Sequence, residues 1–538
     1  MKMNEMCGVV LSISLVGIAQ AGNYGFVEPS SPLAGPYLWS DTTFWRECGD
    51  YKNDITTYRG NIKPMDVPGD GKMLMVDSNY LNPETPLKID EGRFVLVNQM
   101  RLGNIVGQPY GDELHTVALE VGKGATLTTD NQTSAFNVGD AAGASGLMLV
   151  DAGATVSNAA FRIGNSGFGV VSNLGGRIDC RISNANYGSF IGYEATATGH
   201  LVQVSGTGLY GRCRIGRKGT GTLEFLGGGA DFTPTIGADA GGHGTMIVHA
   251  GAAVTNSITV GSGENSYGSL QLCGGTNLCS GNVSIRNTAS AYGEMRGWGA
   301  FYRPSSSDVC GELNGGLYMN GCVIADAAGV EGRVLDLHLA RSGNGGANNA
   351  RTSIANGMDG TNGWYAVDKG VLVYPMLRAN AARYRGTFGD NANLECDFVN
   401  TVRLDYNQKA NKGPWLEARL YANDSAEIPA GLEGKVLGVW GFRSCSSYNN
   451  YATQLTNFTD FGLRVRYDHR KLKAGAGVSL LRYDQKNGTW TRIAQVAHDP
   501  SSPYIAATGM AADGADHDRN LGVFAVVKDT QGLMIILK

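Results

Sequence analysis

The stretch "GHGTMIVHAGAAVTNSITVGSGENSYGSLQLCGG", residues 242–275, contains one pattern twice. Gly244-Thr245-Met246-Ile247-Val248 is followed by the similar segment Gly268-Ser269-Leu270-Gln271-Leu272, and Ile258-Thr259-Val260-Gly261 lies between them. Apolar residues recur at every second position, as in Met246-x-Val248 and Leu270-x-Leu272, which is the pattern of a strand with one face in a core. The stretch therefore predicts short strands separated by glycine-containing turns, arranged as a repeat.

The repeat extends in both directions from this stretch. An Ile or Val followed by Gly recurs at Val138-Gly139, Ile163-Gly164, Ile191-Gly192, Ile215-Gly216, Ile236-Gly237 and Val260-Gly261. The steps between these glycines are 25, 28, 24, 21 and 24 residues. Ile285, which is followed by Arg286, is interpreted as a further copy that has lost its glycine.

Three short strands in about 24 residues, punctuated by Gly and Asn, are typical of one coil of a parallel β-solenoid. Stacked coils pair their backbone groups with the coils on either side at about 4.8 Å, and glycine is needed at corners where φ is positive. The repeat predicts one buried column formed by Ile163, Ile191, Ile215, Ile236, Val260 and Ile285. A β-propeller is the competing interpretation, but its blades need about 40 residues each.

The expected fold is all-β: a right-handed parallel β-helix followed by an antiparallel β-sandwich. We expect a signal peptide over residues 1–21, an N-terminal cap with irregular first coils over 22–116, solenoid repeats over 117–330, and a sandwich-like region over 331–538. Beyond residue 330 the strand-like segments lose the repeat. There, Asn487-Gly488 between two alternating segments predicts a β-hairpin.

The N-terminus has the features of a secretion signal. An apolar run from Cys7 to Ala19 precedes Ala19-Gln20-Ala21, a small-x-small cleavage pattern with Gly22 as the first mature residue. A buried N-terminal helix is the alternative. No later stretch has the 18 apolar residues that a membrane helix needs, so we expect an exported protein with no membrane span after processing.

Composition narrows the function classes. The chain has 538 residues, of which 78 are Gly and 17% are charged, and its net charge is -4. This charge gives no reason to expect a nucleic-acid partner.

Removal of the signal leaves nine cysteines, an odd number, and their spacing does not match a zinc site. Several are expected to fill core positions as small apolar residues, with a local Cys273–Cys279 bridge as the alternative.

The unit "GTLEF…GGGADFTPTIGADAGGHGTMIVHAGAAVTNSITVG" resembles repeats of bacterial autotransporter passenger regions and related surface β-solenoids over about residues 117–290. The segment "FGLRVRYDHRKLKAGAGVSLLRYDQKNGTWTRIAQVAHDP…LGVFAVVKD" resembles β-sandwich modules that end exported repeat proteins of Lentisphaerae and Planctomycetes type. The resemblance implies a surface-exposed solenoid. The chain ends in Leu533–Lys538 and lacks the long alternating strands of an autotransporter barrel.

Residues that could carry chemistry are few. We expect no catalytic, cofactor or metal site: Asp151, Asp179 and Asp231 do not fall in three successive coils, and His243 and His249 have no recurring partner. The loop Asp513–Asp518 lacks a complete calcium pattern, and Asp468-His469 lacks a serine nucleophile motif. A locally basic group could contact an acidic glycan, or form an ordinary solvated face; it comprises Arg177, Arg181, Arg212, Arg214, Arg217 and Lys218.

Two functions follow from these observations. The first is an exported, non-catalytic structural or adhesive protein whose partners are extracellular polysaccharide or cell-envelope components. In that protein Trp415, Trp440 and Trp490 either stack on sugars or fill the core of the sandwich. The second is a polysaccharide lyase or glycoside hydrolase, which predicts at least two carboxylates about 5–10 Å apart in an open groove on the solenoid.

Overall fold

The structure is a computed structural model. It describes residues 23–26, 36–41, 45–48, 73–76, 81–97, 99–103, 116–129, 135–180, 188–249, 252–255, 257–279, 283–285, 287–288, 291–303, 317–319, 322–326, 334–339, 365–369, 371–375, 400–406, 415–421, 425–447, 450–454, 458–467, 472–502, 504–511 and 521–529. None of these residues is helical, so the part of the chain that is described is all-β. The predicted signal peptide lies outside the described residues.

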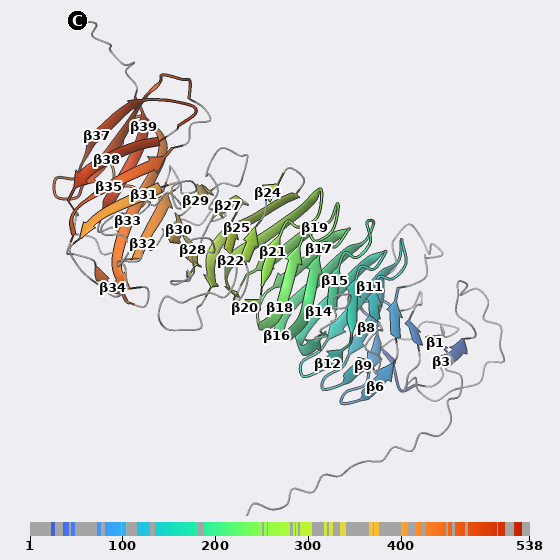
Figure 1. Cartoon of the computed structure of the whole chain (residues 1–538). Coiled ribbons are helices and arrows are strands. Elements are labelled where there is room, and N and C mark those ends of the chain that lie inside the picture. Colours follow the sequence, from blue (N-terminus) through green and yellow to red (C-terminus); the bar gives the residue numbers. More distant parts are fainter. Residues whose placement is uncertain are drawn as a thin grey trace, which may run out of the picture.

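The strands of the first part stack into a parallel β-solenoid with three faces, which forms the elongated body in Figure 1. The first face contains β2 (Tyr37–Leu38), β5 (Leu87–Ile89), β8 (Thr116–Val121), β11 (Ser145–Val150), the starts of β14 (Phe168–Asp179) and β16 (Thr198–Ile215), β17 (Thr220–Phe225), β19 (His243–Val248), the starts of β22 (Ser266–Cys279) and β25 (Ala291–Arg303), β27 (Cys322–Asp326) and β29 (Tyr365–Lys369).

The other two faces follow in every coil. The second face contains β6 (Phe94–Val97), β9 (Thr126–Thr129), β12 (Thr155–Ser157), the end of β14, the middle of β16, the start of β18 (Gly229–Ile236), β20 (Ala252–Thr255), the ends of β22 and β25, β28 (Val334–Leu339) and β30 (Val371–Pro375). The third face contains β1 (Asn23–Phe26), β4 (Met73–Val76), β7 (Gln99–Leu102), β10 (Ala135–Val138), β13 (Ala160–Ile163), β15 (Gly188–Ile191), the ends of β16 and β18, β21 (Ile258–Val260), β23 (Val283–Ile285) and β26 (Leu317–Met319).

Parallel pairing extends beyond residues 117–330 on both sides. On the N-terminal side β4 already pairs with β7, and β5 pairs with β8. On the C-terminal side β28 pairs in parallel with both β25 and β30. At the N-terminal end β1 also pairs antiparallel with β3 (Trp45–Cys48), and near the middle of the chain β24 (Asn287–Thr288) pairs antiparallel with β25.

The core of the solenoid is built from columns of equivalent residues, as the repeat predicts. Ile191 lies opposite Ile215, and Ile215 lies opposite Ile236. The third-face column includes Val76, Leu102, Val138, Ile163, Ile191, Ile215, Ile236, Val260 and Ile285, all completely buried. Each side chain packs on the same position of the next coil, so the hydrophobic contact recurs along the rod.

The corner after this column explains the glycine of each Ile-Gly or Val-Gly step. Gly216 has φ +63°, and a Cβ placed on it would lie 2.1 Å from the carbonyl oxygen of His243. Gly192 has φ +69°, and a Cβ placed on it would lie 2.2 Å from the carbonyl oxygen of Thr220. Both the left-handed backbone and the close contact between coils therefore require glycine.

One coil region departs from a purely apolar core. The buried column that contains Val150 continues into Asn173 and Gln203 before it returns to Phe225. Asn173 donates to Gln203 at 3.2 Å and accepts from the backbone of Gly176 at 2.8 Å, and the hydroxyl of the buried Tyr210 donates to Gln203. These polar residues are tolerated in the core because their buried polar groups form hydrogen bonds.

The last strand of the second face joins the solenoid to the C-terminal sheets. β30 pairs in parallel with β28 on one side and antiparallel with β32 (Trp415–Tyr421) on the other. The sheet then continues through β33 (Lys435–Ser447), which pairs with β34 (Asn450–Gln454) and β39 (Gly522–Lys528); β39 in turn pairs with β36 (Gly477–Asp484), and β36 with β37 (Thr489–Ala497). The C-terminal edge of the second face is thus covered by strand pairing.

A second antiparallel sheet contains β31 (Asn400–Tyr406), β35 (Phe458–Arg466) and β38 (Tyr504–Met510). It packs on the first sheet through buried residues that include Phe461, whose ring lies edge-on to Phe524 at 6.2 Å. This confirms the predicted C-terminal antiparallel β-sheets, visible in orange and red in Figure 1. The predicted hairpin is also confirmed, since β36 and β37 pair across the turn that contains Asn487-Gly488.

The tryptophans and cysteines of the described residues act mainly in the core. Trp440 is completely buried, and Trp490 packs on a small core cluster while it donates to Pro429 O at 3.2 Å. The alternative of a Cys273–Cys279 bridge is wrong, because neither cysteine is in a disulfide. Cys180, Cys213 and Cys279 are buried and form no disulfide, which confirms that they fill core positions.

Candidate ligand-contact surface

A line of long side chains runs along the outside of the third face. In successive coils the register pairs Arg101, Asn137, Arg162, Phe190 and Arg214. Each precedes a member of the buried isoleucine and valine column, and successive residues of a strand point to opposite faces. These five side chains therefore project away from the core, one per coil; the three arginines are partly exposed, whereas Asn137 and Phe190 are buried beneath their neighbours.

The turn after each glycine continues this line. Tyr193 and Glu194 follow Gly192, whereas Arg217 and Lys218 follow Gly216 in the next coil. The turns stay in register, because Arg217 N–H donates to Gly192 O at 3.0 Å. Side chains from neighbouring turns are consequently one coil apart, within reach of one another.

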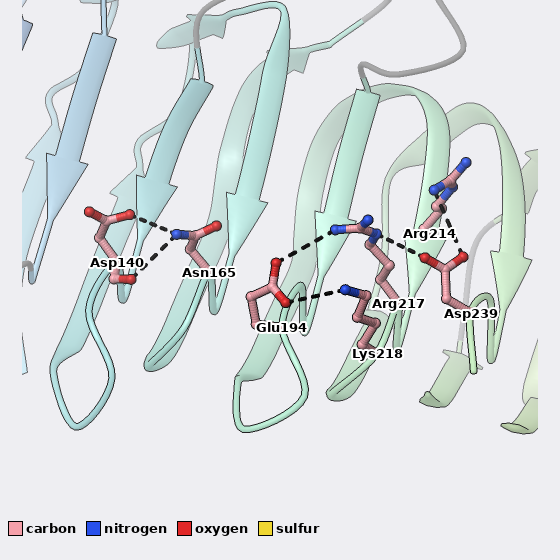
Figure 2. A network of polar contacts seen from close by, with 7 residues as sticks. All are labelled: Asp140, Asn165, Glu194, Arg214, Arg217, Lys218 and Asp239. Carbon is pink, nitrogen blue, oxygen red and sulfur yellow. Dashed lines mark hydrogen bonds and ion pairs between the residues drawn. The ribbon is translucent and has the colours of Figure 1, made fainter. Parts of the chain in front are cut away.

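A charged network joins three consecutive turns (Figure 2). Arg217 donates from Nε to Asp239 Oδ2 at 3.0 Å, and its Nη1 lies 3.9 Å from Glu194 Oε1. Lys218 Nζ lies 3.5 Å from the other oxygen of Glu194, and Arg214 Nη1 lies 3.8 Å from Asp239 Oδ1. Three cations thus share two carboxylates, which partly neutralises the basic patch that the sequence predicts.

A second polar group, at the left of Figure 2, lies in coils that come earlier in the sequence. Asp140 is 7% exposed and accepts hydrogen bonds from Asn137 at 2.6 Å and Asn165 at 2.9 Å. Arg101 Nε lies 3.6 Å from its other oxygen. This buried carboxylate is therefore fully occupied by its own coil and the coils on either side, a structural role.

Aromatic rings hold several of the guanidinium groups. The guanidinium carbon Cζ of Arg162 lies 4.5 Å from the ring centroid of Tyr193, and that of Arg217 lies 4.0 Å from it. Arg162 belongs to the coil before Tyr193, and Arg217 to the coil after it. Phe190 packs edge-on against Tyr193 at 5.2 Å, and Arg214 lies 5.8 Å from Phe190. Such cation–π contacts fix the guanidinium positions.

Arg162 differs from the other cations of this group. No described carboxylate forms an ion pair with it, and its buried Nε has no hydrogen-bond partner among the described residues. Among the residues that the structure describes, the ring of Tyr193 is what faces its charge. We name this group of six residues the arginine–aromatic surface: Arg162, Phe190, Tyr193, Arg214, Arg217 and Lys218.

The structure separates the six residues that the sequence grouped as a basic patch. Arg214, Arg217 and Lys218 lie together, and the exposed Arg212 lies on the same strand, two residues before Arg214. Arg177 is on the second face, where it binds Asp179 at 2.7 Å. Arg181 lies outside the described residues.

Sequence reasoning missed Arg162, Phe190 and Tyr193. The predicted basic patch was chosen for its local density of Arg and Lys. Arg162 was overlooked because no basic residue lies close to it in the sequence. The signal was nevertheless present. Aligning the chain on each Ile-Gly step places Arg162, Phe190 and Arg214 at one position, immediately before the isoleucine, and so predicts that they are neighbours.

One pair of carboxylates comes together on the first face. Glu120 forms an ion pair with Lys88, and Asp151, directly after β11, forms a hydrogen bond with Glu120. Burial, followed by this hydrogen bond, raises the pKa of Asp151 above its usual value. These two carboxyl groups are thus engaged with each other and with Lys88, whereas the hydrolase alternative needs a separated pair in an open groove.

The histidines do not form a metal centre within the described ranges, where no group of three suitable ligands is found. His249 Nε2 lies 2.8 Å from Glu224 Oε1, and His200 Nε2 lies 3.3 Å from the other oxygen. His243 stacks on Tyr267 with ring centroids 6.2 Å apart. The loop Asp513–Asp518 and the pair Asp468-His469 lie outside the described residues.

The fold and this surface define a β-solenoid protein that carries antiparallel sheets at its C-terminal end. Comparison of the chain with protein-family models, with curated proteins and with solved structures finds no match. The described residues include no helix with the length and apolarity needed to cross a membrane.

Proposed function

We propose that this chain is an exported, non-catalytic structural protein of the cell surface or the secreted fraction. Its solenoid serves as a stiff spacer that carries the C-terminal sheets away from the point of attachment. The resemblance of residues 117–290 to autotransporter passenger repeats supports this proposal. So does the N-terminal apolar run that ends in Ala19-Gln20-Ala21, which is typical of a cleaved secretion signal.

The observation that carries the proposal is the continuity of the strand pairing. The three faces repeat from coil to coil, and β30 connects the second face directly to the C-terminal sheet through β32. In solenoids each coil is stabilised by its neighbours, so uninterrupted pairing gives a body that resists bending. A shared sheet passes this stiffness to the C-terminal part.

The carboxylates support a structural role over polysaccharide cleavage. Glu120 and Asp151 are joined to each other and to Lys88, and Asp140 is held by two asparagines at one oxygen and by Arg101 at the other. Glu194 and Asp239 are both held by cations. Carboxylates engaged in this way are not free to act as a separated acid and base.

Two measurements test the proposal. Expression in a Gram-negative host, with fractionation and N-terminal sequencing, is expected to give a mature protein outside the cytoplasm that starts at Gly22. Small-angle X-ray scattering of that protein is expected to show an elongated particle with one well-defined maximum dimension. An unprocessed cytoplasmic protein, or a flexible particle without a defined length, would contradict it.

A further inference from the structure

We propose that the arginine–aromatic surface binds a polysaccharide that carries carboxylate groups, with the sugar chain lying along the axis of the solenoid. This inference rests on the proposed extracellular function, and it names the class of ligand that such a rod would contact. Three features of the surface carry it: an excess of positive charge, guanidinium groups held in place before binding, and a spacing that repeats along the rod.

The first feature is charge. Arg162, Arg214, Arg217 and Lys218 contribute four positive charges, whereas their ion-pair partners Glu194 and Asp239 contribute two negative charges. An anionic ligand would offset this excess, and the half-buried Arg162 is its first contact.

The second feature is preorganisation. Tyr193 is contacted by Arg162 and Arg217, and Phe190 is contacted by Arg214 and Arg217. A guanidinium group that lies over a ring keeps its in-plane N–H donors available, and this planar fork matches a carboxylate. Because the side chains are already ordered, binding costs less conformational entropy than it would for free arginines.

The third feature is spacing. Arg162 and Arg214 occupy the same register position with Phe190 between them, so they are two coils, or about 10 Å, apart. Arg101 lies two coils before Arg162 on the same line. In an extended polysaccharide one sugar ring is about as long as the rise of one coil, so a carboxylate on every second sugar would meet successive arginines. Thr235 and Thr259 continue the line with hydroxyl groups.

Binding of the intact chain to unsulfated hyaluronan, which has a carboxylate on every second sugar, tests the inference by calorimetry at about 0.15 M ionic strength. We expect binding to hyaluronan, much weaker binding to free glucuronate, and none to neutral dextran. Arg162→Gln is expected to weaken hyaluronan binding about tenfold or more, because a charged hydrogen bond is lost. Lys218→Gln, at an exposed position, is expected to weaken it less.

Arg177→Gln is the matched control, since Arg177 is an exposed arginine on a different face. It is expected to leave the affinity for hyaluronan unchanged within about twofold. Equal losses in Arg162→Gln and Arg177→Gln, or equally tight binding of single-stranded DNA, would overturn the inference in favour of non-specific charge attraction. If Arg162→Gln fails to fold, Arg214→Gln and Lys218→Gln decide: no loss in either overturns the proposed site.

Failure of this inference and failure of the proposed function give different results. A processed, rod-shaped protein that does not bind hyaluronan would overturn the glycan site and leave the structural role standing. A protein that is neither processed nor exported would overturn the extracellular role, on which the biological meaning of glycan binding depends, whatever the calorimetry shows.

Discussion

Ile191 lies directly opposite Ile215 in the adjacent coil, and both side chains are completely buried. The same relationship joins Ile215 to Ile236. Because the side chains pack on one another along the rod, the stability of each coil depends on the coils on either side of it. The glycines, the charged turns and the surface arginines all take their positions from this register.

Ile215→Ala is expected to lower the free energy of unfolding by about 2–5 kcal/mol, and Ile215→Val by about 0.5–1.5 kcal/mol, since each leaves a cavity between two isoleucines. Urea denaturation followed by intrinsic fluorescence measures both changes. Thr235→Ala, at the outward position directly before Ile236 in the next coil, is the control and is expected to have little effect. If Ile215→Ala costs no more than this control, the buried column does not exist in solution.

Gly216→Ala is expected to lower the free energy of unfolding by about 3 kcal/mol or more. The left-handed backbone at φ +63° costs about 1–2 kcal/mol for alanine, and the 2.1 Å approach of the new Cβ to His243 O adds steric strain. Gly229→Ala is the matched control, because Gly229 has no positive φ and nothing lies within 4 Å of its Cβ position. Thermal unfolding of the two variants should therefore differ clearly; similar melting temperatures would contradict the corner geometry.

The solenoid could be predicted from the sequence because its register repeats. Once Ile191-Gly192 and Ile215-Gly216 are aligned, the buried column and the positive φ of the glycines follow from the physics of one coil. The C-terminal part has no such repeat. Trp415–Tyr421 forms β32, but pairings such as β33 with β39 join segments far apart in the sequence and leave no periodic signal.

The junction and the surface were predictable only in part. Arg333–Leu339 reads like the strands of the C-terminal part, whereas β28 lies in the solenoid, because local alternation does not reveal whether a strand pairs in parallel. Arg217 and Lys218 were identified as basic, but Glu194 and Asp239 neutralise them from the coils on either side. Counting charges along the chain overlooks partners that stacking brings together.

Stability is expected to fall as the pH rises above about 8.5. Burial raises the pKa of the Cys180 thiol to about 12, and also raises the pKa of Cys213 and of Tyr210. In the unfolded chain these groups ionise near pH 8.5 to 10, so their stabilising contribution is complete below that range and is lost as pH rises toward the folded-state values. Each ionising group lowers the free energy of unfolding by about 1.4 kcal/mol per pH unit.

Urea denaturation between pH 7 and pH 10 measures this slope. The double variant Cys180→Ala and Cys213→Ala is expected to show a shallower decline than the unmodified chain, because two ionising thiols are gone. Val156→Ala, which also removes buried atoms but no thiol, should lower stability at every pH and keep the original slope. Parallel declines for the double variant and the unmodified chain would show that these thiols do not control the alkaline loss.

Leu420→Pro is expected to uncouple the C-terminal sheets from the solenoid. Leu420 lies in β32 between Leu372 of β30 and Trp440 of β33, and proline removes a ladder N–H from a strand paired on both sides. Small-angle scattering should then show a broader distribution of maximum dimensions, while the solenoid itself keeps its thermal stability. Leu420→Val keeps the N–H and favours a strand, so its scattering should match the unmodified chain. Identical curves for both variants would mean that β32 does not hold the two parts together.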